Sequence, residues 1–228
     1  MFMPDLYYLL WIAPALILGF LAQTWISSAY SRGSQIPAST SGFGAARAIL
    51  DAAGLHEVQI EPTPGHLSDH YDPRDKVLRL SDDVFHGHSL AAVGIAAHEA
   101  GHAIQDARGY IPLVVRNLAV PLASGANIGL MMAAFGLMFS MKLLLLAGIV
   151  VFSGVVVFQL INLPVEFNAS SRAKQLLVDL GIVDYQDMGP IRSVLWAAAL
   201  TYVAGTLQSV LTLLYYVSRY SAGSRSDE

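Results

Sequence analysis

Two histidines and a glutamate stand close together among small residues in the stretch AAHEAGHAIQ, residues 96–105. His98 and His102 are four positions apart, so in a helix both imidazoles leave the same face. Two neutral imidazoles at this spacing can bind one Zn²⁺, with Glu99 beside them to accept a proton from a metal-bound water. At this chain's residue frequencies the motif H-E-x-x-H arises by chance in roughly one such chain in two hundred. The stretch therefore predicts a hydrolytic zinc site rather than a helix whose histidines are merely hydrogen-bonded.

A catalytic zinc ion needs a third protein ligand besides one open position. The metzincin extension of the motif would place glycine at 105 and histidine at 108, but Gln105 and Arg108 stand there. The third glutamate of a thermolysin-like enzyme, about twenty residues on, would fall in 118–126, which holds no acidic residue. Asp179, which an intramembrane protease arrangement could use, lies outside the predicted spans. Glu166 is the only glutamate between the motif and the C-terminal residue, so we expect it to be the third ligand. The alternative is a surface glutamate favoured by a helix dipole.

A hydrolase also needs a hydrogen-bond donor for the oxyanion, supplied by His, Tyr or Arg. The candidates are His70 and Tyr71, in the stretch DHYDP, and Arg172 near the third ligand. The same stretch could equally form a turn in which Asp72 bonds its own backbone. The nearby strand KVLRL, residues 76–80, could pair with an extended substrate if it is an exposed edge strand, or be purely structural.

The composition indicates an integral membrane protein. Of the 228 residues, 54% are hydrophobic and only 13% are charged, whereas about 25% charged residues are usual in soluble proteins. The mean hydropathy of +0.51 agrees. A net charge of −4 gives no basic excess for binding nucleic acid. The absence of cysteine excludes disulfides, thiolate zinc sites and cysteine nucleophiles.

Four apolar stretches are each about long enough to cross a bilayer: residues 6–26, 118–139, 143–161 and 194–217. The first lacks a basic n-region and a cleavage site, so we interpret it as a retained anchor rather than a signal peptide. Only three residues separate the second and third stretches, which predicts an antiparallel hairpin. A tail over 218–228 follows the last stretch, and its final residues SAGSRSDE, 221–228, are expected to be disordered.

The polar segment 27–117 carries the elements expected around the motif. An amphipathic helix over 43–55 ends near Gly54, and short strands follow over 57–62 and 76–81. Ser89 is a suitable N-cap for a helix over 89–107 that carries H-E-x-x-H.

The second polar segment, 162–193, is expected to begin with the third-ligand helix. Asn162 can cap this helix, Pro164 suits its first turn, and Gly181 can end it. The two polar segments hold 10 of the 13 Lys and Arg, and the hairpin places both on one membrane face. The positive-inside rule makes that face cytoplasmic, which predicts a multi-pass cell-membrane protein whose catalytic face is in the cytoplasm.

Three blocks in order, 67–85, 89–107 and 163–177, resemble those of the YugP-type membrane proteases, also called neutral zinc metallopeptidases. The resemblance covers nearly the whole chain. More distantly, H-E-x-x-H with a later E-F-x-A helix is similar to the HtpX and CAAX prenyl-protease group of membrane gluzincins. The resemblance implies zinc ligands at His98, His102 and Glu166, and a general base at Glu99.

Two positions depart from the pattern that the resemblance implies. Asn168 stands where an aspartate is expected, and Ser170 stands where HtpX-like enzymes carry an acid four residues after the ligand. Such positions orient the metal ligands, so the departures bear on the tuning of the metal more than on its binding.

Together these observations predict a mainly α, multi-pass membrane protein with about four transmembrane helices and a small zincin-like catalytic region containing a short β-strand element. We expect a single membrane-embedded metallopeptidase domain over 1–228, with one Zn²⁺ per chain. Its predicted function is a membrane-bound zinc endopeptidase that cleaves membrane or membrane-proximal proteins through a zinc-activated water. The expected partners are protein or peptide substrates and the lipid bilayer, not nucleic acid, with membrane-protein partners or homo-oligomers left open.

The competing hypothesis is a non-catalytic membrane scaffold or adaptor that keeps a structural zinc. Structural zinc sites use four protein ligands, and only three are evident, which favours catalysis. A metal transporter would need charged residues inside several spans, and the four predicted spans contain none.

Overall fold

The computed structural model describes residues 6–225 of the chain, which are mainly helical with one three-stranded sheet. Residues 226–228 of the predicted tail lie outside the described part. Two compact units are formed. The helical unit comprises Met1–Leu21, Val115–Leu163 and Thr201–Glu228, and the sheet-containing unit comprises Ala22–Val114 and Pro164–Leu200.

Three long helices are apolar enough to cross a membrane, as the sequence predicts for the first, third and fourth spans. They are α1 (Leu6–Ser34), α7 (Lys142–Asp179) and α8 (Met188–Arg225), the last overlapping a candidate span of Tyr185–Ala222. The segment 221–228 was expected to be disordered, but α8 continues through the start of it to Arg225.

The predicted second span, 118–139, falls on two helices instead of one. α5 (Ile111–Ser124) and α6 (Ala126–Met138) are bent by 43° at the break between them, so the pair is either one broken span or a re-entrant loop. Pro121 lies inside α5 and lacks an N–H to donate, and Gly125 separates the two helices. The tight turn that follows is present, with Ser140 at a φ of +56°.

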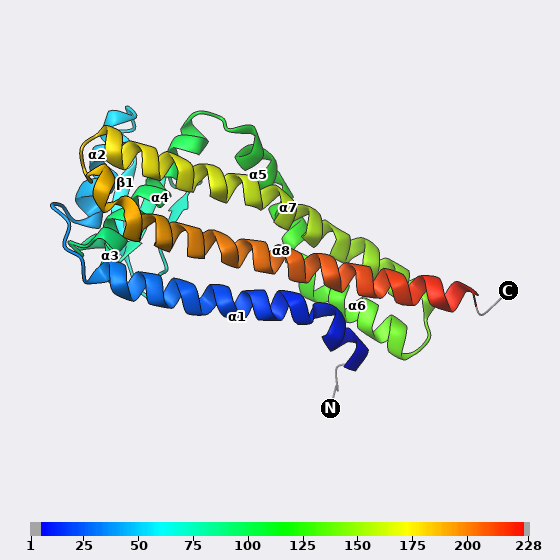
Figure 1. Cartoon of the computed structure of the whole chain (residues 1–228). Helices are drawn as coiled ribbons and strands as arrows, with labels where there is room; N and C mark the ends of the chain where they lie inside the picture. The colour runs from blue at the N-terminus through cyan, green and yellow to red at the C-terminus, as the bar shows by residue number, and fades with distance from the viewer. Residues whose placement is uncertain (1–5, 226–228) are drawn as a thin grey trace. The chain divides into compact units, whose positions relative to one another are not determined.

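The third-ligand helix does not begin at Asn162. α7 runs without interruption from the apolar span through Glu166, with Pro164 inside it (Figure 1). Asn162 is buried within the helix and accepts a hydrogen bond from Arg116 Nε at 3.2 Å. Proline is tolerated inside membrane helices because neighbouring groups can satisfy the backbone groups that it frees. The apolar span and the helix that carries Glu166 are therefore one continuous element.

The sheet-containing unit begins with local structure close to the sequence prediction. α2 (Gly42–Ala52) is capped by the Ser41 hydroxyl, and Gly54 follows it at a φ of +76°. After the sheet and the short α3 (Asp82–Phe85), α4 (Leu90–Ala107) begins at Ser89, whose hydroxyl accepts a hydrogen bond from Ala92 N–H.

The sheet has the order β1-β3-β2, which places the strand expected at the edge in the centre. β3 (Val77–Ser81) pairs in parallel with β1 (Gln59–Thr63) and antiparallel with β2 (His70–Asp72). The prediction that KVLRL offers an exposed edge to a substrate is therefore wrong, because both sides of β3 are already paired. The stretch DHYDP contributes β2 rather than only a turn.

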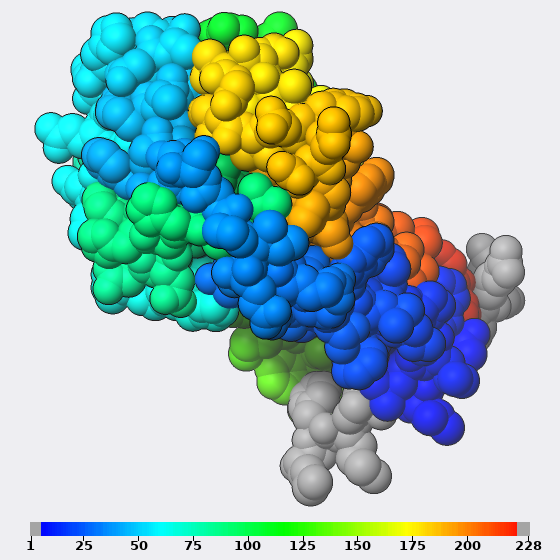
Figure 2. Space-filling view, turned by 60° about the vertical axis from the view of Figure 1, so that its left-hand side comes forward, coloured from blue at the N-terminus to red at the C-terminus, as the bar shows by residue number. Residues whose placement is uncertain are grey.

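Small residues on α4 allow the neighbouring helices of this unit to approach closely. A Cβ on Gly101 would lie 3.0 Å from the Ala169 carbonyl oxygen of α7, and one on Gly94 would lie 3.0 Å from the Ile191 side chain of α8. One buried cluster joins residues of α2, the sheet, α4, α7 and α8. In Figure 2 the blue and cyan residues of α2 and the sheet lie against the yellow end of α7. This packing fixes the position of α4 relative to Glu166.

Candidate metal centre

The side chains of His98, His102 and Glu166 converge in the core of the sheet-containing unit. One ligand atom from each lies within 4.8 Å of the other two. Oε2 of Glu166 is 3.3 Å from Nε2 of His98 and 3.6 Å from Nε2 of His102. Glu166 is buried, whereas the two histidine side chains remain 14% and 15% exposed. The cluster is therefore accessible from the histidine side and closed behind the glutamate.

The three residues fit a divalent cation. Oε2 of Glu166 is buried and has no hydrogen-bond partner among the described residues, because neither imidazole approaches it with hydrogen-bond geometry. A buried carboxylate oxygen without a donor is costly unless a cation compensates it. Two ligands of one tetrahedral zinc ion are separated by about 3.3 Å, close to the distances observed here. An ion between the three atoms would satisfy the unpaired oxygen.

The electrostatic environment of His102 also attracts a cation. Burial acts to lower the pKa of His102, but the carboxylates of Glu166 and Glu99 outweigh burial and raise the pKa above its ordinary value. The same negative potential that favours a proton on the imidazole favours a metal ion in its place.

Gln105 determines which nitrogen of His102 faces the cluster. Its Nε2 donates to the Val165 carbonyl oxygen at 2.8 Å, and because a carbonyl oxygen can only accept, the amide orientation is fixed. Oε1 of Gln105 must then face Nδ1 of His102, at 2.9 Å, and must accept its hydrogen. The hydrogen of the neutral ring therefore lies on Nδ1, and the lone pair of Nε2 is directed to the cluster.

Ser170 has the corresponding position beside His98. Its Oγ lies 3.1 Å from His98 Nδ1. This contact agrees with the expectation that position 170 orients a ligand. Both histidines are thus held by neutral groups, an amide and a hydroxyl.

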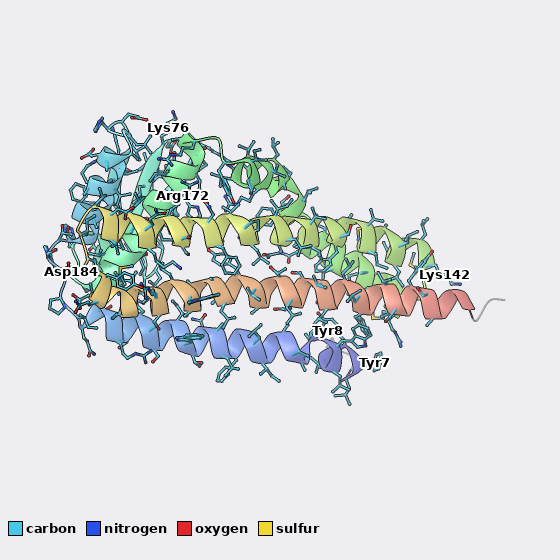
Figure 3. The ribbon with its side chains drawn as sticks, turned by 45° about the horizontal axis from the view of Figure 1, so that its top comes forward. Tyr7, Tyr8, Lys76, Lys142, Arg172 and Asp184 are labelled. Atoms are coloured by element: carbon cyan, nitrogen blue, oxygen red, sulfur yellow. The ribbon has the colours of Figure 1, made fainter. Side chains whose placement is uncertain are left out.

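Asn168 and Arg172 extend the network behind His102. Oδ1 of Asn168 accepts from Gln105 Nε2 at 3.0 Å and from Arg172 Nε at 2.7 Å. The Arg172 guanidinium also lies 6.0 Å from the centroid of the Tyr110 ring, on the stretch of α7 that runs beside α4 (Figure 3). Through Asn168 and Gln105, Nε of Arg172 is connected to the Nδ1 side of His102.

Each of the other candidate oxyanion donors is hydrogen-bonded to a different group. His70 is exposed on β2, and its Nδ1 lies 2.8 Å from the Ser68 carbonyl oxygen. The Tyr71 hydroxyl donates to Asp106 Oδ2 at 3.0 Å, and burial followed by the Asp106 carboxylate raises the pKa of Tyr71. Tyr71 therefore ties β2 to the end of α4 in this structure.

Glu99 is half-buried on α4, next to the first histidine of the motif. Its carboxylate contributes to the raised pKa of His102, so it lies within electrostatic range of the cluster. The positioning role of Gln105 was not anticipated from the sequence. The available signal was a glutamine three residues after a candidate ligand, near the end of a helix rich in small apolar residues.

Comparisons with known proteins agree with a metallopeptidase. Residues 8–221 match a family model described as "putative neutral zinc metallopeptidase". The chain is similar to the "putative membrane protease YugP" of Bacillus subtilis (strain 168), with 43% identity over 212 residues that cover 92% of this chain and 94% of that protein. No solved structure matches the chain. The family match spans both elements that carry the converging residues.

Proposed function

Because the chain belongs to the neutral zinc metallopeptidase family, we propose that it is a membrane-bound zinc endopeptidase that hydrolyses peptide bonds in membrane or membrane-proximal proteins. The observation that carries the proposal is the convergence of His98, His102 and Glu166 around a buried, unpaired carboxylate oxygen. Three protein ligands leave a position open to water and substrate, as catalytic zinc sites require.

In this proposal His98, His102 and Glu166 would hold the zinc ion, and the bound ion would supply Lewis-acid chemistry for the scissile carbonyl and for a water nucleophile at neutral pH. Glu99 accepts the proton of the attacking water and returns it to the departing nitrogen, which restores its carboxylate. Gln105 and Ser170 keep Nε2 of the two histidines directed at the cluster through their contacts with Nδ1.

The competing function is a membrane scaffold that retains zinc without catalysis. It differs from the proposed enzyme in giving Glu99 no role, since Glu99 is not one of the three converging residues. Glu99→Gln keeps the size of the side chain but removes its basicity, so the enzyme should lose at least 100-fold in activity while zinc content stays unchanged.

The test compares purified wild type, Glu99→Gln and the control Glu57→Gln, which alters an exposed glutamate ahead of β1. Bound zinc and cleavage of unfolded membrane-protein substrates are measured for each. Zinc in all three with cleavage lost only in Glu99→Gln supports the endopeptidase. Equal zinc with no cleavage by any of them, over a broad substrate panel, favours the scaffold.

A further inference from the structure

The outward face of α7 changes character next to the metal ligand. Most exposed residues recur at intervals of three or four positions, with one interval of about two turns before Val157, which places them on one face. From Leu143 to Phe167 every exposed residue is apolar, and every exposed residue of α7 after Phe167 is polar: Leu143, Leu146, Val150, Val151, Val157, Leu160, Pro164 and Phe167, then Ser171, Gln175 and Asp179. Glu166 immediately precedes Phe167 but points inward, being 4% exposed against 38% for Phe167.

The apolar part of this face has the length that a bilayer requires. From Leu143 to Pro164 a helix rises about 32 Å at 1.5 Å per residue, close to the 30 Å of a hydrocarbon core. On the same helix Lys142 directly precedes this stretch, and the exposed polar positions from Ser171 onward follow it. An exposed apolar face of this length bounded by polar residues fits lipid acyl chains.

The other two long helices show the same change, each beside a tryptophan. On α1, exposed Phe20 and Leu21 are followed by an exposed polar series that surrounds Trp25: Gln23, Thr24, Ser27, Ser28, Ser31 and Arg32. On α8, exposed Arg192 precedes the 56% exposed Trp196, and the exposed residues beyond it are apolar or aromatic as far as Val217, apart from Gln208.

The three aromatic residues at these changes are close neighbours within the sheet-containing unit. The ring centroids of Phe167 and Trp196 are 5.9 Å apart. Trp25 Nε1 donates to Ser193 Oγ at 3.2 Å, one helical turn from Trp196. We call Trp25, Phe167 and Trp196 the aromatic belt. The amphipathic tryptophan ring prefers the boundary between a bilayer and water, and Phe167 packs against one of the two tryptophans.

We infer that the bilayer surface lies at the aromatic belt, so that the metal centre acts at the depth of the lipid headgroups. Glu166 is adjacent to a belt residue and is followed within about one turn by the polar face of α7. Given the proposed peptidase function, the substrate class is then a juxtamembrane segment, cleaved within about one helical turn of the membrane surface. A bond deep in the hydrocarbon core and a bond in a distant soluble domain are both excluded by this placement.

The absence of cysteine from the chain allows the depth to be measured directly. Leu160→Cys and Ser171→Cys, made separately, place one nitroxide label on each side of Phe167 on the same exposed face of α7. Asp179→Cys serves as the control on the water side. The labelled full-length proteins are reconstituted into phosphatidylcholine vesicles containing some phosphatidylglycerol. Electron paramagnetic resonance then compares accessibility to oxygen, which partitions into lipid, with accessibility to a water-soluble nickel chelate.

The expected result is a reversal of the oxygen-to-nickel accessibility ratio between the label at 160, which favours oxygen, and the label at 171, which resembles the label at 179. A label at 171 that favours oxygen would place the metal centre inside the bilayer and overturn the inference. A label at 160 that favours nickel would place the centre away from the membrane and overturn it as well. The label measurement needs no catalytic activity, so it remains valid if the proposed peptidase function fails. Equally, an unexpected depth of the labels would leave the proposed peptidase function standing.

Discussion

At the scale of single residues, the proposed metal centre depends on the direction of a few hydrogen bonds. The Val165 carbonyl fixes the Gln105 amide, the amide fixes the tautomer of His102, and Arg172 supports the amide through Asn168. The sequence identified both histidines because an i, i+4 pair is a local pattern. It could not identify Gln105, because its role depends on contact with a helix sixty residues away.

Replacing Gln105 tests this network. Gln105→Leu keeps a similar volume but removes the acceptor for His102, so we expect zinc affinity to fall about 10- to 100-fold. Gln105→Glu keeps an acceptor but cannot donate to the Val165 carbonyl, so it should also bind zinc more weakly than wild type. Affinity is measured by competition with a chromophoric chelator, with Gln175→Leu, exposed on the same face as Asp179, as the control. If Gln105→Glu bound zinc as tightly as wild type, the fixed direction of the amide would be refuted.

A second residue-scale prediction concerns Asp69, which is partly buried and accepts hydrogen bonds from the backbone N–H and Oγ of Ser81. Burial raises the pKa of Asp69 even though the bonds from Ser81 lower it. A carboxyl whose folded-state pKa is raised contributes stability at low pH that is lost as the pH rises through that pKa.

Asp69→Asn keeps an oxygen acceptor for Ser81 but cannot ionise. We therefore expect the melting temperature of wild type relative to Asp69→Asn to decrease as the pH is raised from below the ordinary aspartate pKa to neutrality. Thermal unfolding in detergent at a series of pH values measures this difference. A difference that stayed constant or increased with pH would show that the charged form of Asp69 is not penalised by burial.

At the scale of elements, the close packing of α4 against α7 brings the two halves of the centre together. The sequence predicted α4 well, because Ser89, the apolar periodicity and Gly109 are local signals. The sequence-based prediction split α7 into two helices at Asn162 and Pro164. It did so because these residues can either start a helix or lie within a helix that packs against a neighbour. The central position of β3 could not be predicted from the sequence, because strand order depends on pairing between segments that are distant in the chain.

Gly101→Ala tests the approach of α4 to α7. The added methyl group would lie 3.0 Å from the Ala169 carbonyl oxygen, so the helices must separate, at a cost of about 1–3 kcal/mol in the free energy of unfolding. Because Glu166 is on α7 and both histidines are on α4, zinc affinity should decrease as well. Gly189→Ala is the matched control, since a Cβ there meets nothing within 4 Å. Equal melting temperatures and zinc affinities for the two variants would contradict the proposed role of this contact.

At the scale of the whole molecule, this chain belongs to a family of zinc metallopeptidases and has three helices that are long and apolar enough to cross a membrane. The hydrophobic composition and the three long helices follow from the same apolar stretches, so this feature was predictable from the sequence alone. The division into two compact units was not, because it depends on contacts between segments far apart in the chain. The cytoplasmic orientation of the catalytic face stays a prediction of the positive-inside rule.

The central claim is that His98, His102 and Glu166 together form one zinc site, and the zinc content of purified protein tests it most directly. Wild type and Glu99→Gln should each contain about one zinc ion per chain, and Glu166→Gln should contain little after dialysis, because it lacks the third ligand. Elemental analysis of the three proteins, matched for folding by melting temperature, gives the answer. Full zinc in folded Glu166→Gln would contradict the account.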